Sequence, residues 1–284
     1  MLKAITFLLL RIFSNPIANS FQKKLACKYS SLLINLYSYL IMSIACIIPA
    51  TQVNWKNFSF EFWLYAFIAG ALCSLGTVCL IKALRNGEIS ILGPINSYKC
   101  VIGLISSFIL LKEIPTILGF FGLLLIVAGS WINFDTTDEG VSLALFKRQD
   151  IQLRFAALFL TGIEASFLKK IIVMSSAEIS FILWSFGGFV FSVLFILFQK
   201  DRLKIPERKD LKFFGAIAFC LTIMQYSTNI VFKYFDVGLS LALFQLSSLV
   251  AIFLGYKYFN EKDMFQKALG TVVMLAGAAF ILIR

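Results

Sequence analysis

The stretch from Gly87 to Leu111, GEISILGPINSYKCVIGLISSFILL, most constrains what this chain can fold into. It is long enough to cross a bilayer as a helix, because about 20 apolar residues span the hydrocarbon core. Pro94 predicts a kink about one turn into the helix, since proline lacks an N–H and clashes with the preceding turn. Asn96, Lys99 and Gly103 follow at i, i+3 and i+7 and share one helix face. A lysine near mid-span costs roughly 3 kcal/mol to insert, so we expect Lys99 to line a substrate cavity rather than to face lipid.

Composition identifies the class of protein. Of the 284 residues, 60% are hydrophobic and 14% are charged, whereas soluble domains carry about 25% charged residues. The apolar runs are continuous, which predicts an all-α membrane protein and argues against a β-barrel of short alternating strands. The formal charge of +11 comes from basic residues that flank these runs, where they meet lipid headgroups. We therefore expect a lipid bilayer, and no nucleic acid, as a partner.

The residue types that catalysis and metal binding need are scarce. The chain has no histidine, its six cysteines form no C-x-x-C pair, and no G-x-x-x-x-G-K-[ST] motif occurs. A zinc site, a serine–histidine triad and an ATP-driven pump are therefore disfavoured. We expect no enzymatic activity, no cofactor and no metal.

Ten apolar spans can be marked along the chain. They cover about residues 2–22, 31–50, 60–82, 88–111, 115–134, 151–172, 178–198, 211–233, 238–259 and 264–283. The first span begins like a signal peptide, but no cleavage site follows it, so we interpret it as a membrane helix. A polar connection at 135–150 divides the chain into a first five-helix repeat, 1–134, and a second, 151–284.

A short motif recurs before and within the last span of each half. Both copies have the spacing E-x8-G-x6-G, offset by 148 residues, and they comprise Glu113, Gly122, Gly129 and Glu261, Gly270, Gly277. Glycines seven apart share a helix face and let neighbouring backbones approach closely. Each glutamate is expected at the positive end of the helix that follows it. Five spans per half give the halves opposite orientations, which is the inverted-repeat plan of many secondary transporters.

Two longer segments carry a family pattern. KALRNGEISILGPINSYKCVIGLISSFILLKEIPTILGFFGLLLIVAG at 82–129 has a small-residue turn, a helix with a mid-span proline, an L-x-E ending and a glycine-spaced last helix. KYFDVGLSLALFQLSSLVAIFLGYKYFNEKDMFQKALGTVVMLAG at 233–277 is a weaker copy, with Leu243, Phe244 and Gln245 in the region of the proline. On these segments the whole chain resembles the drug/metabolite transporter superfamily, in its ten-helix branch with two EamA-type domains. The resemblance implies a multi-pass carrier of small metabolites in the cell (inner) membrane, working by exchange or with a proton and without ATP.

Orientation in the membrane stays open at this point. Ten spans place both termini on one side, which carries seven basic residues, whereas the other side carries seventeen. The positive-inside rule then predicts both termini outside. The family resemblance implies both termini inside.

Three charged residues lie deep within the spans, away from their ends, and are candidates for substrate binding. Glu164 lies near the middle of the sixth span, where a carboxylate must be paired or protonated. It could carry a coupling proton, bind a substrate amine, or form a structural ion pair with Lys99 or Arg11. Lys99 could hold a substrate carboxylate or phosphate, or simply neutralise Glu164. Arg11, in the short first span, could instead extend toward the interface.

Uncharged polar and aromatic residues complete the predicted site. Buried amides either bond between helices or line a cavity, and as a set facing one cavity they would suit a zwitterionic substrate. Deep aromatic rings could form a cavity wall that stacks on an aromatic or cationic substrate. Packing remains the simpler alternative for each of these residues, and for Tyr98 above all, since it points to a different face from Lys99. The candidates are Asn96, Gln225, Asn229, Gln245, Tyr98 and Trp184.

The function that these patterns favour is secondary transport, as an exporter or exchanger, of small polar metabolites such as amino acids or related amines. Alternating access would operate around a cavity at the membrane midplane. A flippase for a lipid-linked sugar or another amphiphile is the alternative. A structural or receptor-like membrane protein would pack its polar residues between helices without a cavity.

Overall fold

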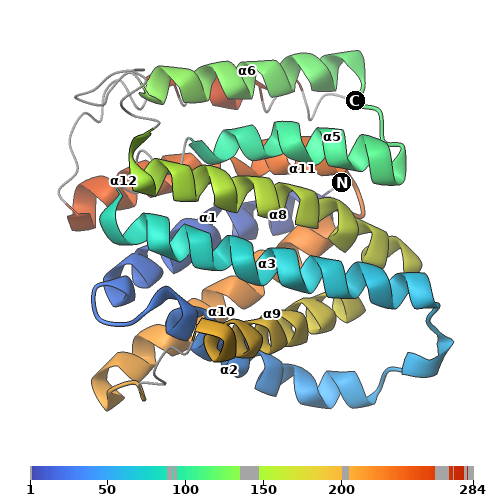
Figure 1. The fold of residues 1–284 in the computed structure, drawn as a ribbon. Coiled ribbons are helices and arrows are strands. Elements are labelled where there is room, and N and C mark those ends of the chain that lie inside the picture. Colours follow the sequence, from blue (N-terminus) through green and yellow to red (C-terminus); the bar gives the residue numbers. More distant parts are fainter. Residues whose placement is uncertain are drawn as a thin grey trace.

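The computed structural model describes residues 2–87, 92, 95–134, 147–199, 205–259, 269–270, 272–277 and 280. Within these residues the regular elements are helices and no strand occurs, which confirms the prediction of an all-α fold (Figure 1). Gly93, Pro94, Glu261 and most of the connection at 135–150, about which the sequence made predictions, lie outside the described residues.

Four long helices and one shorter one are described with their bounds in the first half. α1 covers Leu2–Ala26, α2 covers Ser31–Thr51 and α3 covers Phe60–Asn86. A 3₁₀ turn, η2 (Asn96–Tyr98), leads into α5 (Lys99–Leu111), and α6 covers Ile117–Phe134. A further 3₁₀ turn, η1 (Trp55–Asn57), joins α2 to α3.

The second half repeats this order. α8 covers Gln149–Met174, α9 covers Ala177–Gln199 and α10 covers Arg208–Val231. The ninth predicted span is two helices, α11 (Val237–Phe244) and α12 (Ser247–Phe259), with a break at Gln245 and Leu246. Residues 272–277 are helical as well.

Two further spans, the fourth and the first, differ in detail from their predictions. The fourth span was expected as one kinked helix, but a 3₁₀ turn interrupts it: Leu92 and Ile95 are α-helical, Asn96–Tyr98 form η2, and α5 begins at Lys99. Asn96 and Gly103 therefore do not share a face of one continuous α-helix. α1 runs to Ala26 and contains Pro16 without ending there. Its polar residues, including Arg11, are buried against other helices, which supply the packing that an exposed helix of this composition would lack.

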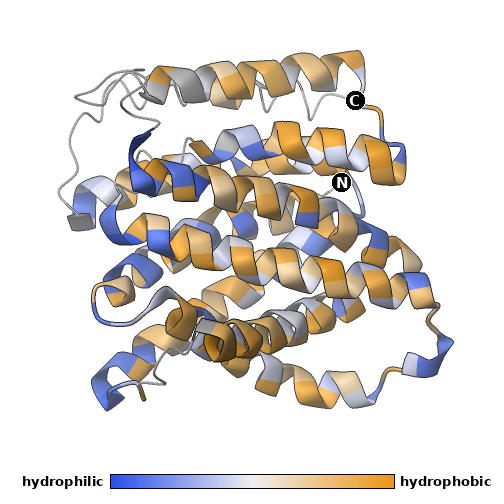
Figure 2. Ribbon diagram, in the orientation of Figure 1, coloured by the Kyte–Doolittle hydropathy of each residue, from blue (hydrophilic) through white to orange (hydrophobic). Residues whose placement is uncertain are grey.

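Five described helices are long and apolar enough to cross a membrane. They are Ser31–Thr51, Phe60–Asn86, Ala177–Phe198, Arg208–Val231 and the pair within Val237–Tyr258. Hydrophobic residues dominate the helices (Figure 2). Large apolar side chains stay on the outside of the bundle, for example Phe198 at 81% exposed and Phe67 at 62% exposed. Such a surface suits lipid and not water, so the chain is a multi-pass membrane protein.

The packing of the helices follows the repeat. α1 packs along α10, and α3 packs along α8 in the equivalent way, while α2 packs on α9. Each of these contacts joins the first half to the second, so the two halves interlock rather than sit apart (Figure 1).

The glycines of the repeated motif lie at a further contact between the two halves, on α6 and on the helical segment near the C-terminus. A Cβ added at Gly129 would lie 2.5 Å from the carbonyl oxygen of Gly270, and one added at Gly277 would lie 2.6 Å from the carbonyl oxygen of Gly122. No side chain fits at such a distance, so only glycine lets these two helices approach. The predicted close approach of backbones is confirmed, and it is reciprocal between the two copies of the motif.

Glu113 was predicted to lie at the start of the helix that follows it in the chain, and this prediction was wrong about the helix. α6 begins only at Ile117, and Glu113 Oε2 instead accepts a hydrogen bond from the backbone N–H of Val237 at 2.8 Å. Val237 is the first residue of α11, whose leading N–H groups have no partner within the helix. The carboxylate does lie at the positive end of a helix dipole, but that helix belongs to the other half of the chain.

Candidate functional site

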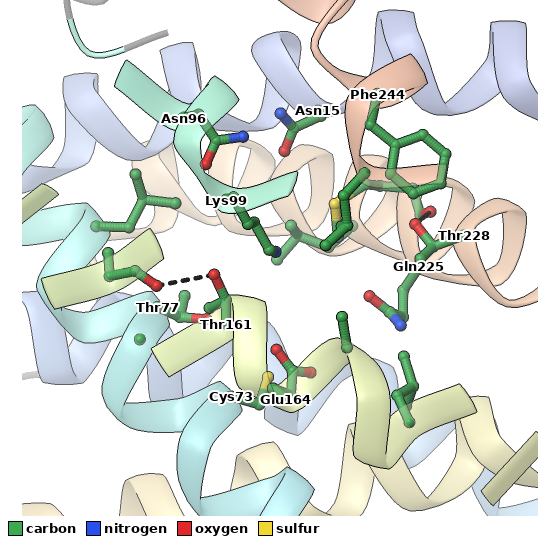
Figure 3. A pocket seen from close by; sticks show the side chains of 18 of the residues that line it. Asn15, Cys73, Thr77, Asn96, Lys99, Thr161, Glu164, Gln225, Thr228 and Phe244 are labelled. Carbon is green, nitrogen blue, oxygen red and sulfur yellow. Dashed lines mark hydrogen bonds between the residues drawn. The ribbon is translucent and has the colours of Figure 1, made fainter. Parts of the chain in front are cut away.

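A cavity lies between the two halves, near the middle of the bundle (Figure 3). It has a volume of about 100 Å³ and is lined by residues of α1, α2, α3, α8, α9 and α10 and of the segments around α5 and α11. Six of the nine residues that the sequence suggested for the site line it: Arg11, Asn96, Lys99, Glu164, Trp184 and Gln225.

α1 contributes a polar stripe to the cavity. Arg11, Asn15, Asn19 and Gln22 stand at i, i+4, i+8 and i+11, which is one face of an α-helix, and all four line the cavity. This explains why α1 is polar for a membrane helix, since its polar face meets the cavity and not lipid. Asn15, Asn19 and Gln22 were not among the predicted site residues, although their spacing from Arg11 would have grouped them with it.

Arg11 is held firmly although it is charged and only 7% exposed. Its Nε donates a hydrogen bond to Thr228 Oγ1 at 3.0 Å, and its guanidinium lies 4.7 Å from the ring centroid of Phe244. Thr228 is fixed in turn, because its hydroxyl donates to the carbonyl of Met224 at 2.8 Å. Arg11 therefore points into the cavity and does not extend to the interface.

Glu164 is the one carboxylate among the described residues of the cavity lining, and it is 7% exposed. Its Oε1 accepts a hydrogen bond from Trp184 Nε1 at 2.9 Å. The Trp184 ring packs against Tyr39 with centroids 4.9 Å apart, and the Tyr39 hydroxyl lies 2.8 Å from Cys73 Sγ. An indole and a phenol thus position the carboxylate from its outer side.

Lys99 and Glu164 do not form the structural ion pair that the sequence left open. Among the described residues, ion pairs within 4 Å join Lys28 to Asp210, Arg148 to Asp150, Lys169 to Glu113 and Lys209 to Glu207. Lys99, Arg11 and Glu164 all lie outside this set and line the same cavity, where Figure 3 shows Lys99 and Glu164. Their charges are thus available to a bound molecule.

Asn96 and Gln245 occupy matching places in the two repeats and contact each other. Asn96 Nδ2 donates to Gln245 Oε1 at 3.2 Å, and Gln245 Nε2 donates to the carbonyl of Leu241 at 2.9 Å. Asn96 lines the cavity, whereas Gln245 is buried behind it. The pair ties the two halves together at the cavity wall.

Asn229 and Tyr98 also lie outside the lining. Asn229 accepts a hydrogen bond from Gln225 Nε2 at 2.9 Å and donates to the carbonyl of Ala177 at 3.0 Å, which links α10 to the start of α9. The Tyr98 ring packs near Phe155, with centroids 6.2 Å apart. Asn229 supports Gln225 from behind, and Tyr98 faces away from Lys99, as its position next to Lys99 suggested.

Arg154 was missed as a site residue because its place near the start of the sixth span suggested a loop charge. It is 6% exposed, lines the cavity, and donates from Nε to the carbonyl of Leu92 at 2.9 Å. Arg154, Ala157, Thr161 and Glu164 stand at i, i+3, i+7 and i+10 on α8. This spacing on one face would have shown that Arg154 shares the side of Glu164.

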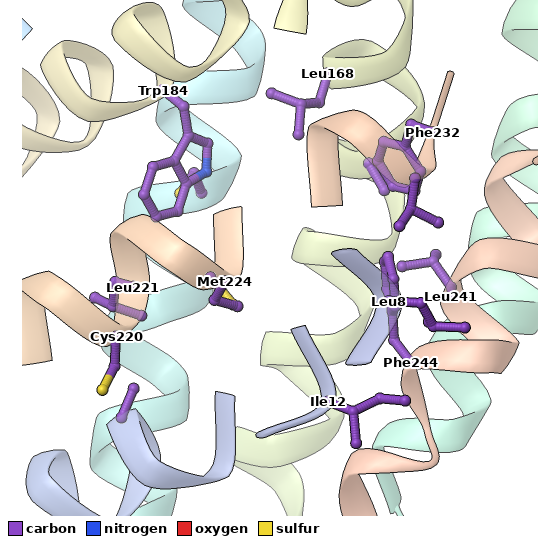
Figure 4. Close-up of a cluster of buried hydrophobic side chains, with 14 of the residues drawn as sticks. Leu8, Ile12, Leu168, Trp184, Cys220, Leu221, Met224, Phe232, Leu241 and Phe244 are labelled. Atoms are coloured by element: carbon purple, nitrogen blue, oxygen red, sulfur yellow. The ribbon is translucent and has the colours of Figure 1, made fainter. Parts of the chain in front are cut away.

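The two ends of the cavity differ in polarity. A smaller hollow of about 20 Å³ shares Asn15, Asn19, Asn96 and Arg154 with it and continues toward the end of the bundle where α1 and α3 finish. We call that end of the bundle the basic end, because more of the lysines and arginines that flank the helices lie there than at the opposite end. Toward the opposite end the lining includes the apolar side chains of Leu168, Phe232 and Leu241, which belong to the buried cluster drawn in Figure 4.

A polar network closes the protein beyond this apolar layer. Lys169 forms an ion pair with Glu113, and its Nζ also donates to the carbonyl of Phe235 at 2.9 Å. Glu113 binds the N–H of Val237. We call Glu113, Lys169, Phe235 and Val237 the latch. It joins the end of α5 to α8 and to the start of α11, so it connects the two halves at the end opposite the basic end.

Two comparisons with known proteins find matches that cover most of the chain. The model of the EamA-like transporter family matches residues 2–134 and 151–283. Among solved structures, one titled "Crystal structure of protein" superposes with a TM-score of 0.73 at 15% sequence identity, covering 98% of this chain and 94% of that one. At that identity the likeness shows the fold alone. No curated protein sequence matches.

Proposed function

Because the chain belongs to the EamA-like transporter family, we propose that it is a secondary transporter of small polar metabolites, such as amino acids or related amines. It would act as an exporter or exchanger in the cell (inner) membrane. The two repeats, 1–134 and 151–284, would be the two units that move relative to each other.

One observation supports this proposal above the others. Charged side chains that belong to both halves, Arg11 and Lys99 from the first and Glu164 from the second, line one cavity without pairing within 4 Å. Burying unpaired charges is costly, and in membrane proteins such residues are found where a substrate or an ion passes. A purely structural protein would gain nothing from leaving them unpaired around a void.

Alternating access follows from the polarity of the two ends. In this conformation the polar lining runs toward the basic end, while the apolar layer and the latch close the other end. Cargo would therefore reach Lys99 and Glu164 from the basic end. Release would require the Glu113–Lys169 ion pair to separate while the halves close at the basic end.

Glu164 is the residue that would carry a coupling proton. A buried carboxylate can exchange between a charged and a neutral form at modest cost when a neighbouring group compensates, and Lys99, in the same lining, is the candidate for that group. In the charged form it would also bind a substrate ammonium. Both roles predict that transport fails when Glu164 is replaced by glutamine.

Counterflow in proteoliposomes tests the proposal. Vesicles loaded with an unlabelled amino acid, amine or organic acid would take up the labelled form of the same solute when the protein is a carrier. Glu164→Gln should abolish uptake, whereas Glu61→Gln, at an exposed position in the first turn of α3, should leave it unchanged. Absence of counterflow with every solute would refute the proposal. Flipping of a fluorescent lipid by the same vesicles would then favour the flippase.

A further inference from the structure

Arg11 is a buried cation with an unused donor. It is 7% exposed, and its Nη1 has no hydrogen-bond partner among the described residues, although Nε is bound to Thr228. A guanidinium carries donors in a rigid fork that matches a carboxylate or a phosphate. Leaving one of them empty in a buried position costs free energy unless a ligand fills it.

The charges of the cavity are unbalanced. Arg11, Lys99 and Arg154 line it, and Glu164 is the one carboxylate among the described lining residues. The lining thus carries an excess of two positive charges. Phe244 and Thr228 position the Arg11 guanidinium but bring no negative charge to it. Such a cavity attracts anions and repels cations.

The surroundings of Arg11 hold it ready for a ligand. The contact with the Phe244 ring and the hydrogen bond from Nε to Thr228 fix the plane and the direction of the guanidinium before anything binds. A group that is already ordered loses little entropy when a ligand arrives. Lys99, which lines the same cavity and forms no ion pair with Glu164, is a second cation for the same ligand.

We propose that the cavity selects cargo with net negative charge, a dicarboxylate or a phosphate monoester, and that Arg11 with Lys99 binds its anionic group. This rests on the proposed transport function and narrows it. A simple amine lacks the group that Arg11 needs and adds a third excess positive charge. A zwitterion supplies one carboxylate, but it has no net charge and so leaves the excess of two positive charges in the cavity.

Thermal stabilisation of the purified full-length protein by solutes of matched size tests the charge rule. Succinate, 4-aminobutyrate and 1,4-diaminobutane share a four-carbon chain and carry charges of about −2, 0 and +2 at neutral pH. Glycerol 3-phosphate represents the phosphate monoesters. We expect stabilisation by succinate or glycerol 3-phosphate, and none by 1,4-diaminobutane. Stabilisation by succinate would indicate a site for dicarboxylates, and stabilisation by glycerol 3-phosphate would indicate a site for phosphate monoesters.

Three variants locate the effect. Arg11→Gln should weaken binding of the dianion about 10- to 100-fold, because a hydrogen bond between charged groups is lost. Lys99→Gln should weaken it less and serves as the second variant should Arg11→Gln fail to fold. Arg85→Gln, the same exchange at an exposed position at the end of α3, should bind like the wild type.

The outcomes separate the two proposals. Stabilisation by 4-aminobutyrate or 1,4-diaminobutane without any by a dianion would overturn the charge rule, as would a dianion effect that persists in both Arg11→Gln and Lys99→Gln. If proteoliposomes exchange a neutral solute and Arg11→Gln does not affect that exchange, the transport function is supported and the proposed anion site is refuted. If no solute of any charge exchanges, the transport function itself falls.

Discussion

Removing Glu113 should open the protein at the end opposite the basic end. Its carboxylate binds two partners from the second half: Oε1 forms an ion pair with Lys169, and Oε2 accepts a hydrogen bond from the N–H of Val237 at 2.8 Å. Both side chains of the ion pair are only 12% exposed. Glu113→Ala removes the carboxylate and leaves the Lys169 ammonium with the carbonyl of Phe235 alone.

The size of the effect follows from these contacts. Breaking one side of a fully buried ion pair costs about 3–5 kcal/mol, and the slight exposure here reduces this. The lost bond from a backbone N–H to a charged acceptor is worth about 1.5–3 kcal/mol. Since the two terms overlap, we expect roughly 3 kcal/mol, which shifts an opening equilibrium about 100-fold.

Hydrogen–deuterium exchange of the segment 232–244 measures this directly. The amide of Val237 is at the start of α11 and has no acceptor within that helix, so its protection depends on Glu113. We expect its exchange to speed up about 100-fold in Glu113→Ala. Glu113→Gln, which keeps an acceptor oxygen, should have a smaller effect.

Glu61→Ala is the matched control. Glu61 is an exposed glutamate in the first turn of α3, at the same end of the bundle. It should leave the exchange of Val237 unchanged. Slow exchange of Val237 in Glu113→Ala, as in the wild type, would refute the assignment of the latch.

Three further substitutions test the packing by their effect on thermal stability. Gly129→Ala places a Cβ 2.5 Å from a backbone oxygen and should cost about 2–3 kcal/mol, whereas Gly215→Ala, with nothing within 4 Å, should be neutral or stabilising; equal melting temperatures would contradict this. Asn35→Ala removes buried bonds to two serine hydroxyls, at 3.1 and 2.8 Å, and should cost about 1–3 kcal/mol; no loss would mean that these bonds do not hold α2 in place. Tyr29→Phe removes a bond of 2.9 Å to Asp210 and should cost about 1 kcal/mol, with retention of full stability as the contrary result.

Much of the fold could be predicted because membrane helices obey simple rules. Apolar length located the helices, and the spacing of Gly122 and Gly129 against Gly270 and Gly277 indicated where backbones meet. The 3₁₀ turn before Lys99 and the break at Gln245 could not be predicted from hydropathy. Both are changes of backbone direction that long-range contacts decide.

The site was predictable where a charge interrupts an apolar run. Arg11, Lys99 and Glu164 stood out for that reason, and all three line the cavity. Arg154 did not, because it lies near a span end, where basic residues are common. The sequence did not predict that Lys99 and Arg11 form no ion pair with Glu164. The carboxylate of Glu164 accepts a hydrogen bond from Trp184 instead, and only the packing of α8 against α9 brings these two residues, twenty positions apart, together.

Filling the cavity from one helix tests the central claim, that the space between the two halves is the transport path. Ala165 lines the cavity on α8, and Ala156 on the same helix is exposed. We would measure counterflow of the solute that the vesicle assay identifies, in Ala165→Phe and in Ala156→Phe, after confirming that both variants are folded and monodisperse. The account predicts that Ala165→Phe abolishes exchange and Ala156→Phe retains it. Equal rates in the two variants would contradict it.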